Sequence, residues 1–279
     1  MDKLKTYLKH PLSFVLLILI GLASIITVAS IIFIIIYILV NGIPNLTTDL
    51  FSLHYNSKNQ SMLPSIFNTV FITFLTLLIA VPIGIFSAVY LVEYAKKGSK
   101  LVKVIRVTTE TLAGIPSIVF GLFGFLAFVI ALGWGYSMTA GVLTLVMMVL
   151  PTIIRTTEEA LLAVPNSYRE GSFGLGAGKI RTIFKIIVPT AIPGILSGVI
   201  LAIGRIVGET AALIYTSGTV AETATSLTDS ARTLSVHLYC LLSEGLFTNQ
   251  AYATAVILLL LVVGINALSN FIAKKLAKK

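Results

Sequence analysis

Long apolar stretches alternate with short polar segments along the whole chain. A helix needs about 20 apolar residues to cross a bilayer, and six stretches approach or exceed that length: about 13–40, 65–92, 107–132, 137–154, 188–214 and 251–272. An Asn-Gly-Ile-Pro sequence at 41–44 ends the first stretch, and a Gly-Trp-Gly sequence at 133–135 predicts a tight turn between the third and fourth. We therefore predict an all-α, polytopic membrane protein with six transmembrane helices.

The composition agrees with this prediction. The chain has 279 residues, of which 57% are hydrophobic and only 11% are charged, and its mean hydropathy is +1.00. A soluble domain could not bury so much apolar surface. The apolar run at 13–40 is too long for the core of a cleavable signal peptide, so we expect it to be retained as an anchor.

The basic residues fall on one side of the predicted spans. All of the 20 Lys and Arg residues precede the first span, follow the last, or lie in the second-to-third or fourth-to-fifth connections, except Lys58, Arg205 and Arg232. The positive-inside rule then predicts that both termini are cytoplasmic. Attraction to an anionic leaflet explains the net charge of +9, so we expect a lipid bilayer and no nucleic acid as a partner.

The sequence contains few signs of enzyme chemistry. No Walker A, C-x-x-C or H-E-x-x-H pattern is present, so we expect no metal, no cofactor, no catalytic residues and no ATP site in this chain. The energy source must then be another subunit or an ion gradient. Cys240 is the one cysteine, and we interpret it as a small core or interface residue.

The basic loop between the fourth and fifth spans contains signals for one short helix. Ser167 and Glu170 have S-x-x-E spacing, which predicts that Ser167 caps a helix whose third residue is Glu170. Gly176 is suited to end this helix, because glycine adopts the left-handed conformation without a steric cost. We expect a helix at about 168–175, followed by a membrane helix that begins near Pro189.

Polar residues interrupt the second and third spans. Ser65, Thr69, Thr73 and Thr76 have a spacing that places their hydroxyls on one face of a helix. This face either lines a polar pathway or forms hydrogen bonds between helices. In the third span we expect Glu110 to lie near the cytoplasmic interface.

The fifth span contains two opposite charges. Charges inside a membrane are costly, so Arg205 and Glu209 favour a functional interpretation. Their i,i+4 spacing predicts that they share one helix face and offset each other's charge. The alternative is a structural pair beside a close-packing seam, since Gly204 and Gly208 have G-x-x-x-G spacing.

The loop between the fourth and fifth spans resembles the EAA loop of ABC importer permeases. Four residues match the pattern of that loop: Glu170, Gly176, Ile186 and Pro189. Gly171 and Ser172 replace its two alanines, and Val188 replaces its leucine. A capped helix alone can occur in any cytoplasmic loop. The resemblance therefore rests on the spacing of all four matching residues.

Two further segments resemble the phosphate-type permeases of this family. The run at 114–124 is similar to their aGvPSivfGlfG segment, and the run at 204–211 is similar to their GRaiGETAp segment, as found in PstA-type subunits. The resemblance covers 65–272, the expected permease core. Residues 1–60 would add a cytoplasmic N-terminus, a first span and an outer loop, and residues 273–279 a basic tail.

The resemblance implies a type-1 ABC importer permease of a bacterial or archaeal cytoplasmic membrane, which carries inorganic phosphate inward by alternating access. It implies three partners: a second, PstC-like permease subunit, a dimeric ATPase and an external phosphate-binding protein. ATP hydrolysis would then take place outside this chain. The implied substrate-pathway residues are Arg205, Glu209, Thr210, Ser117, Thr69 and Thr73. The implied ATPase-coupling residues are Ser167, Glu170, Gly171, Ser172, Gly176, Ile186 and Pro189.

Three other functions stay open from the residues alone. An ABC permease for sulfate, molybdate or an amino acid would share the EAA-type loop. A secondary transporter would use Glu209 as an ion relay and would be expected to contain inverted repeats, of which we see none. An intramembrane enzyme would need a nucleophile and a base, but the histidines all fall outside the predicted spans.

Overall fold

The computed structural model describes residues 11–96 and 98–277, and within these ranges it contains helices and no strand. The longer helices are α2 (Pro11–Gly42), α3 (Leu63–Val89), α4 (Lys100–Ala113), α6 (Met138–Leu162), α9 (Val188–Val207) and α12 (Thr248–Ala277). The shorter helices are α5 (Ser117–Gly124), α7 (Asn166–Gly174), α8 (Lys179–Thr182), α10 (Ala211–Thr216) and α11 (Leu234–Glu244). Wide π-helical turns extend three of the helices, at Tyr90–Tyr94, Phe125–Ala131 and Ile183–Ile187.

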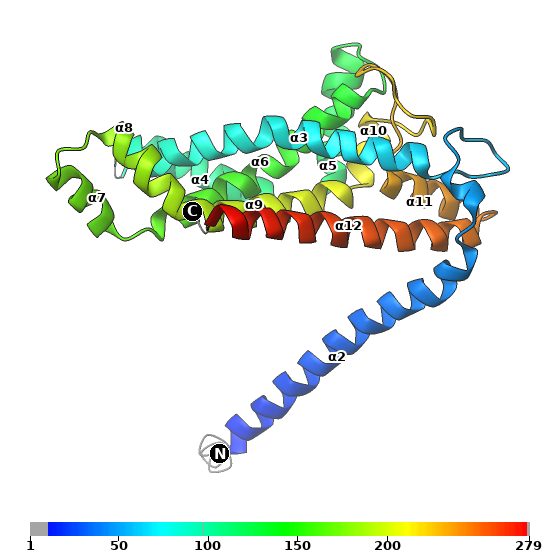
Figure 1. Ribbon diagram of the computed structural model, residues 1–279, viewed down its shortest axis with the longest axis horizontal. Helices are drawn as coiled ribbons and strands as arrows, with labels where there is room; N and C mark the ends of the chain where they lie inside the picture. Colours follow the sequence, from blue (N-terminus) through cyan, green and yellow to red (C-terminus); the bar gives the residue numbers. More distant parts are fainter. Residues whose placement is uncertain (1–10, 97, 278–279) are drawn as a thin grey trace.

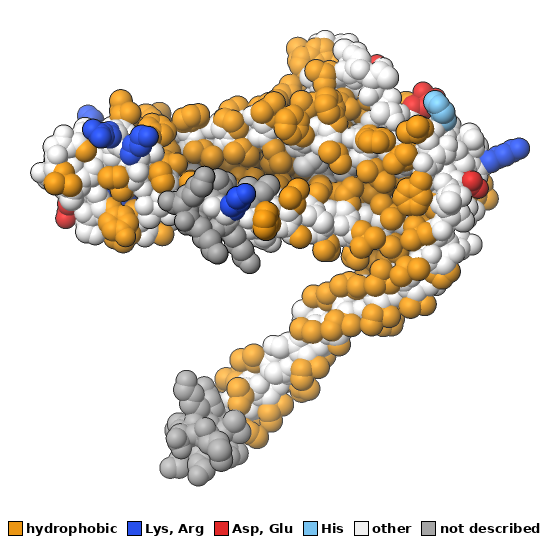
Figure 2. Space-filling view, in the orientation of Figure 1, with side chains coloured by type: hydrophobic (Ala, Val, Ile, Leu, Met, Phe, Trp, Pro, Cys, Tyr) orange, Lys and Arg blue, Asp and Glu red, His pale blue; other side chains and the backbone are white. Residues whose placement is uncertain are grey.

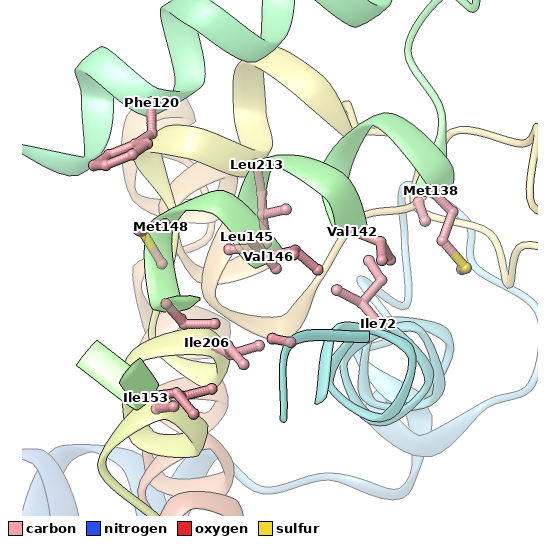
Figure 3. Packing of buried hydrophobic residues seen from close by; sticks show 14 of the residues in the cluster. Ile72, Phe120, Met138, Val142, Leu145, Val146, Met148, Ile153, Ile206 and Leu213 are labelled. Carbon is pink, nitrogen blue, oxygen red and sulfur yellow. The ribbon is translucent and has the colours of Figure 1, made fainter. Parts of the chain in front are cut away.

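The body of the molecule is a bundle in which α3, α6, α9 and α12 lie alongside one another (Figure 1). The α6 helix packs against both α3 and α9, and α9 packs against α12. Side chains from several helices meet in the main apolar core, shown in Figure 3, where Ile72 of α3, Leu145 of α6 and Leu213 of α10 are among the buried residues. The core therefore joins segments that are distant in the sequence.

The first helix, α2, diverges from this body (Figure 1). Its contacts are made at its C-terminal end, where the Tyr37 and Tyr252 hydroxyl oxygens are 3.3 Å apart. Gly42 also lies so close to Tyr252 and Val256 of α12 that a larger side chain would not fit. The 13–40 stretch is thus one uninterrupted apolar helix, as the hydropathy predicts, and nearly all of its side chains are exposed.

Among the described residues, five helices are long and apolar enough to cross a membrane. The expectation of one continuous third span at 107–132 is wrong, because α4 and α5 meet at an angle of 103°. Pro116 explains the break: it lacks an N–H group and disfavours helical geometry in the residue before it. A sixth span exists only if this bent pair is counted as one.

The expected fifth span at 188–214 also differs from the structure. A continuous helical run begins at Lys179 rather than near Pro189, and it ends at Val207. The wide turn at 183–187 contains Lys185, the residue whose carbonyl the ring of Pro189 would clash with in a regular α-helix. After a break at 208–210, the chain continues as the short helix α10.

The long segment 217–249 packs onto the end of the bundle instead of extending from it. Asn68 of α3 fixes this segment: its amide donates to the carbonyls of Glu222 (3.0 Å) and Arg232 (3.2 Å) and its oxygen accepts from the N–H of Ala224 (3.1 Å). The α11 helix lies within this segment, and one side of it is buried against α3, α10 and α12.

We predict that His237 makes this end of the protein acid-sensitive. Its side chain is fully buried beside Arg232, and burial and this positive charge lower its pKa from 6.5 to about 4. Above about pH 6.5 the histidine is neutral in both states, whereas between pH 6.5 and 4 only the unfolded chain takes up the proton. Stability should therefore fall by about 2 kcal/mol between pH 7.5 and 5.

Thermal unfolding of the detergent-solubilised protein at these two pH values measures the effect. His237→Asn keeps an acceptor near Arg232 but removes the titration, so its loss of stability on acidification should be smaller than that of the wild type. An equal loss in both proteins would show that other groups cause the acid sensitivity.

Candidate functional site

The α7 helix begins directly after Pro165, which has the extended conformation of a residue flanking a helix. The expected cap is wrong: the helix starts at Asn166, so Ser167 is its second residue and forms no capping hydrogen bond. Pro165 cannot continue the preceding helix, because it lacks an N–H group and disfavours helical geometry in the residue before it, so the new helix begins directly after it. Glu170 is consequently not part of a capping box, and it is exposed.

The other end of α7 is as predicted. Gly176 has φ +80°, the N–H of Ala177 donates to the carbonyl of Ser172 (3.0 Å), and the N–H of Gly176 donates to that of Phe173 (2.9 Å). These two bonds form a Schellman motif. The prediction that Gly176 ends the helix is therefore confirmed, and the chain turns sharply into α8.

A buried hydroxyl pair joins α7 to α8. The Ser172 and Thr182 hydroxyl oxygens are 2.8 Å apart, and both side chains are almost fully buried. Gly171, in contrast, is exposed, and a methyl group in its place would meet no neighbouring atom. An alanine would thus fit at 171, whereas at 172 it would lose the hydrogen bond.

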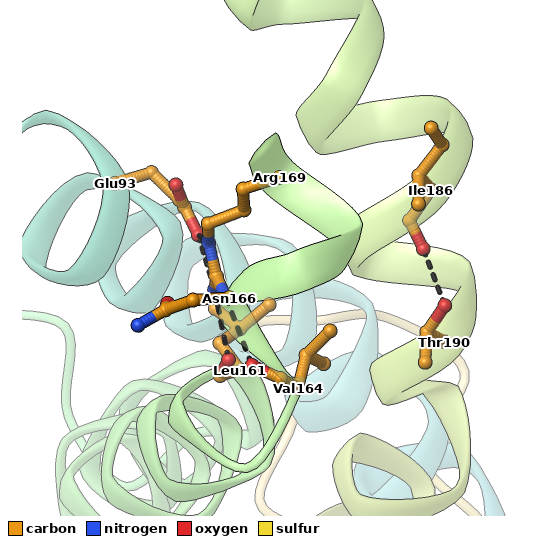
Figure 4. Close-up of polar contacts among 7 residues, drawn as sticks. All are labelled: Glu93, Leu161, Val164, Asn166, Arg169, Ile186 and Thr190. Carbon is orange, nitrogen blue, oxygen red and sulfur yellow. Dashed lines mark hydrogen bonds and ion pairs between the residues drawn. The ribbon is translucent and has the colours of Figure 1, made fainter. Parts of the chain in front are cut away.

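Arg169 connects α7 to two other elements (Figure 4). Its guanidinium donates to the carboxylate of Glu93, at 2.7 and 3.0 Å, and to the carbonyls of Leu161 (3.0 Å) and Val164 (2.9 Å). Glu93 belongs to the wide turn after α3, and the two carbonyls lie at and just beyond the end of α6. The Glu93 and Arg169 side chains are only 9% and 16% exposed, so this ion pair is largely dry.

The sequence interpretation missed this pair. Arg169 is one of several basic residues in its loop, and Glu93 belongs to none of the motifs found in the sequence. The available signal was a lone acidic residue at the end of an apolar span, on the side where the basic residues gather.

The outer surface of the α7–α8 segment (residues 166–182) combines apolar and charged side chains. Tyr168, Phe173, Leu175 and Ile180 are exposed, and Glu170 lies among them in sequence. Figure 2 shows apolar, basic and acidic side chains together at this end of the molecule. The segment is thus a rigid projection with the mixed surface typical of a protein-binding site.

The remaining predicted coupling residues lie just beyond this segment. Ile186 is half-buried within the wide turn, and its carbonyl accepts from the hydroxyl of Thr190 at 2.6 Å (Figure 4). Pro189 is exposed in the helix that follows. Both residues are therefore part of the continuous helical run that begins at α8.

The predicted pairing of Arg205 with Glu209 is wrong. The α9 helix ends at Val207, so the two residues do not share a helix face, and no ion pair joins them within the described ranges. The Glu209 carboxylate instead accepts from the N–H of Ala212 at 3.0 Å, at the start of α10. A carboxylate there is stabilised by the free N–H groups and the positive end of the helix.

Arg205 lines a cavity of about 520 Å³ on the other side of this break. We call it the Arg205 cavity; its lining residues are Thr152, Ile200, Leu201, Gly204, Arg205 and Asn266. These residues come from α6, α9 and α12, all of which are long enough to cross a membrane. A guanidinium is permanently charged, so this cavity offers a positive group among membrane-spanning helices.

The structure does not bring the other predicted pathway residues to this cavity. Thr69 and Thr73 are buried, and their hydroxyls donate to carbonyls of α3, while the Thr69 oxygen also accepts from the N–H of Leu234. Ser117 begins α5, and Thr210 precedes α10. In this conformation Thr69 and Thr73 therefore form hydrogen bonds within the subunit, which agrees with the packing alternative for these two residues. The buried hydroxyls of Ser65 and Thr76, on the same helix face, have no hydrogen-bond partner among the described residues.

Comparison with known proteins identifies the class. Residues 80–279 match the family described as binding-protein-dependent transport system inner membrane component. This chain belongs to that family, the permease subunits of ABC importers, and the resemblance seen in the EAA-type loop is confirmed.

Individual relatives refine the comparison. The chain is 32% identical over 277 residues to "Probable ABC transporter permease protein YqgI" of Bacillus subtilis, covering 93% of this chain and 94% of that protein. It is 45% identical over 140 residues to "Phosphate transport system permease protein PstA 1" of Mycobacterium tuberculosis. The latter match covers 50% of this chain and 45% of the relative.

Solved structures agree on the fold. A chain of the bacterial alginate ABC transporter, solved in complex with an alginate-bound periplasmic protein, aligns with a TM-score of 0.71 at 15% identity and covers 98% of both chains. A chain of the inward-facing MetNI methionine ABC transporter aligns with a TM-score of 0.60 at 20% identity, over 76% of this chain and 93% of that chain. At these identities the likeness defines the fold alone.

We predict that Arg169→Ala frees the α7–α8 segment from the bundle. The variant leaves the Glu93 carboxylate buried without its partner, and losing one member of a buried pair costs about 3–5 kcal/mol. Backbone amides of 166–182 should exchange with solvent much faster than in the wild type. Arg181→Ala, which removes an exposed arginine from the same segment, is the matched control and should leave exchange unchanged. Equal protection in both variants would contradict the assignment.

Proposed function

We propose that this chain is a phosphate-transporting permease subunit, which admits inorganic phosphate to the cell by alternating access. The observation that carries the proposal is the guanidinium of Arg205, open to a cavity lined by three membrane-spanning helices. Guanidinium forms paired, charge-assisted hydrogen bonds with phosphate oxygens. The partial identity to PstA-type proteins from several bacteria supports the same substrate.

The proposed complex contains three kinds of partner. One cavity wall needs a facing wall, so a second, related permease of the PstC type would complete the pathway. A dimeric ATPase would hydrolyse ATP, and an external phosphate-binding protein would deliver the substrate. The alginate transporter was solved in complex with a periplasmic protein that binds alginate. This chain itself would catalyse no reaction.

The α7–α8 segment is the proposed contact with the ATPase. It projects from the bundle, the Arg169–Glu93 pair restricts its movement relative to α3 and α6, and the Ser172–Thr182 hydroxyl pair holds α7 against α8 within it. Closure of the ATPase dimer would displace this segment together with the helices bonded to it. With the termini and this segment in the cytoplasm, as the basic residues predict, 217–249 would face the binding protein.

Labelled-phosphate uptake by proteoliposomes that contain the complete complex tests the substrate. Arg205→Gln should lower uptake at least 100-fold, because the cavity loses its positive charge, while complex yield and basal ATP hydrolysis stay at wild-type levels. Arg205→Lys keeps the charge but loses the paired geometry and should retain an intermediate rate. Wild-type uptake by Arg205→Gln would remove Arg205 from the pathway, and uptake of another solute but not phosphate by the native complex would overturn the substrate.

A second prediction concerns Glu170, which is exposed on α7 and plays no part in its capping. Glu170→Lys reverses one surface charge without disturbing the helix, so the complex should assemble in the membrane but show at least tenfold weaker stimulation of ATP hydrolysis by the loaded binding protein. Lys103→Glu, a charge reversal on exposed α4, serves as the control. Normal coupling in Glu170→Lys would exclude this residue from the ATPase contact.

A further inference from the structure

A basic groove lies at the base of the α7–α8 segment, and neither the ATPase contact nor the Arg205 cavity accounts for it. Its volume is about 830 Å³, and we call it the α8 groove. Figure 2 shows Lys and Arg side chains beside apolar ones at the end of the molecule where α8 lies. All six lining residues are exposed: Gly178, Lys179, Ile180, Arg181, Phe184 and Lys185.

The three cations of this groove have no acidic partner among the described residues. Lys179 instead lies over the ring of Tyr94, with its Nζ atom 4.6 Å from the ring centre. Glu93, which precedes that tyrosine, is already bonded to Arg169. The groove therefore carries a positive charge that a bound anion would offset.

The apolar side chains of the groove continue onto a membrane-spanning helix. The ring centre of Phe184 is 6.5 Å from that of Phe86 on α3, and Phe86 is itself exposed. Tyr90 and Tyr94, in the wide turn after α3, are exposed as well. Tyrosine is enriched at the boundary between membrane and water, because its ring is apolar and its hydroxyl is polar. These neighbours place the groove at such a boundary.

The charge pattern of the helical run from Lys179 to Val207 indicates the same depth. Lys185 is the last charged residue before the apolar part of this run, and the next is Arg205. A basic residue at the end of a span lies at the level of the lipid headgroups, because its aliphatic stem extends along the hydrocarbon. The basic loops predict that this end faces the cytoplasmic leaflet, which contains anionic lipids.

We propose that the α8 groove binds an anionic phospholipid of the cytoplasmic leaflet. Arg181 and Lys185 bind its phosphate, and Phe184 and Phe86 contact its acyl chains. A protein partner fits the groove less well, because the apolar side of the groove continues along the exposed surface of a membrane-spanning helix. The lipid braces the base of the segment and leaves Glu170, on α7, to the ATPase. This inference does not depend on which solute the complex carries.

Quenching of a tryptophan in the groove by brominated lipid tests the proposal. Trp134→Phe removes the one native tryptophan, and Phe184→Trp introduces the reporter. The chain, alone and in the complete complex, is reconstituted into phosphatidylcholine vesicles that contain increasing fractions of brominated phosphatidylglycerol or brominated phosphatidylcholine. Phosphatidylglycerol should bind beside the reporter at least fivefold more strongly, since one basic residue near an anionic leaflet strengthens attachment about fivefold.

Arg181→Gln combined with Lys185→Gln should bring this preference to within about twofold of one. The matched control is Lys100→Gln combined with Lys103→Gln, which removes two exposed cations of α4 that do not line the groove. The control should keep the fivefold preference. Melting temperatures of both variants establish that they are folded.

Three outcomes would overturn the proposal. The first is a preference near one in the reporter protein, or an unchanged preference once Arg181 and Lys185 are replaced. The second is an equal decrease in the α4 control, which would assign the preference to the general basic charge of this side. The third is quenching of the reporter in the isolated chain but by neither lipid in the complete complex, which would show that a protein subunit covers the groove.

Discussion

The ion pair between Arg169 and Glu93 is the interaction on which the geometry of the projecting end depends. It joins the turn after α3, the end of α6 and the first turns of α7 through a single guanidinium. Each of these elements ends in unsatisfied carbonyls, and the guanidinium has enough donors to bond two of them together with the carboxylate. Without it, α7 would be connected to the bundle chiefly through its contact with α8.

A second constraint acts on the membrane-spanning region: the backbone N–H and C=O groups at breaks in its helices need hydrogen-bond partners within the protein. Helix ends within a bilayer expose polar backbone groups that lipid cannot satisfy. The break at 208–210 is resolved internally: Glu209 accepts from the N–H of Ala212, and its own carbonyl accepts from the hydroxyl of Ser235 at 2.6 Å. Glu209 therefore bonds to the start of α10 and not to Arg205, which lines the separate Arg205 cavity.

Hydropathy was sufficient to predict the all-α class and most spans, because long apolar runs have few structural alternatives. The end of α7 was also predictable, since Gly176 supplies a conformation that other residues avoid. The start of α7 was not predictable from the capping-box spacing of Ser167, because the helix begins directly after Pro165 instead. The errors in the third and fifth spans likewise lay at Pro116, Pro189 and Gly208, residues whose effect on a membrane helix depends on their neighbours. The predicted end of the fourth span, at 154, lies eight residues before the end of α6 at Leu162.

The site was less predictable than the fold, for a physical reason. Glu93 and Arg169 are 76 positions apart, so no local pattern connects them. The predicted pairing of Arg205 with Glu209 assumed a helix that continues past both residues, but α9 ends at Val207. The position of Asn266 in the lining of the Arg205 cavity had no signal in the sequence, because the neighbours of an asparagine in a membrane helix are known only from the structure.

The continuous helix from Lys179 to Val207 has a mechanical consequence. At 1.5 Å per residue, its 29 residues form a rod of about 43 Å. One end is bonded to α7 through Thr182, and Arg205 lies close to the other. Force applied at α8 is therefore transmitted to the Arg205 cavity along one piece of secondary structure, without crossing a loop. The wide turn at 183–187 departs from regular α-helical hydrogen bonding, so a displacement of α8 would reach the Arg205 cavity through one irregular stretch of helix.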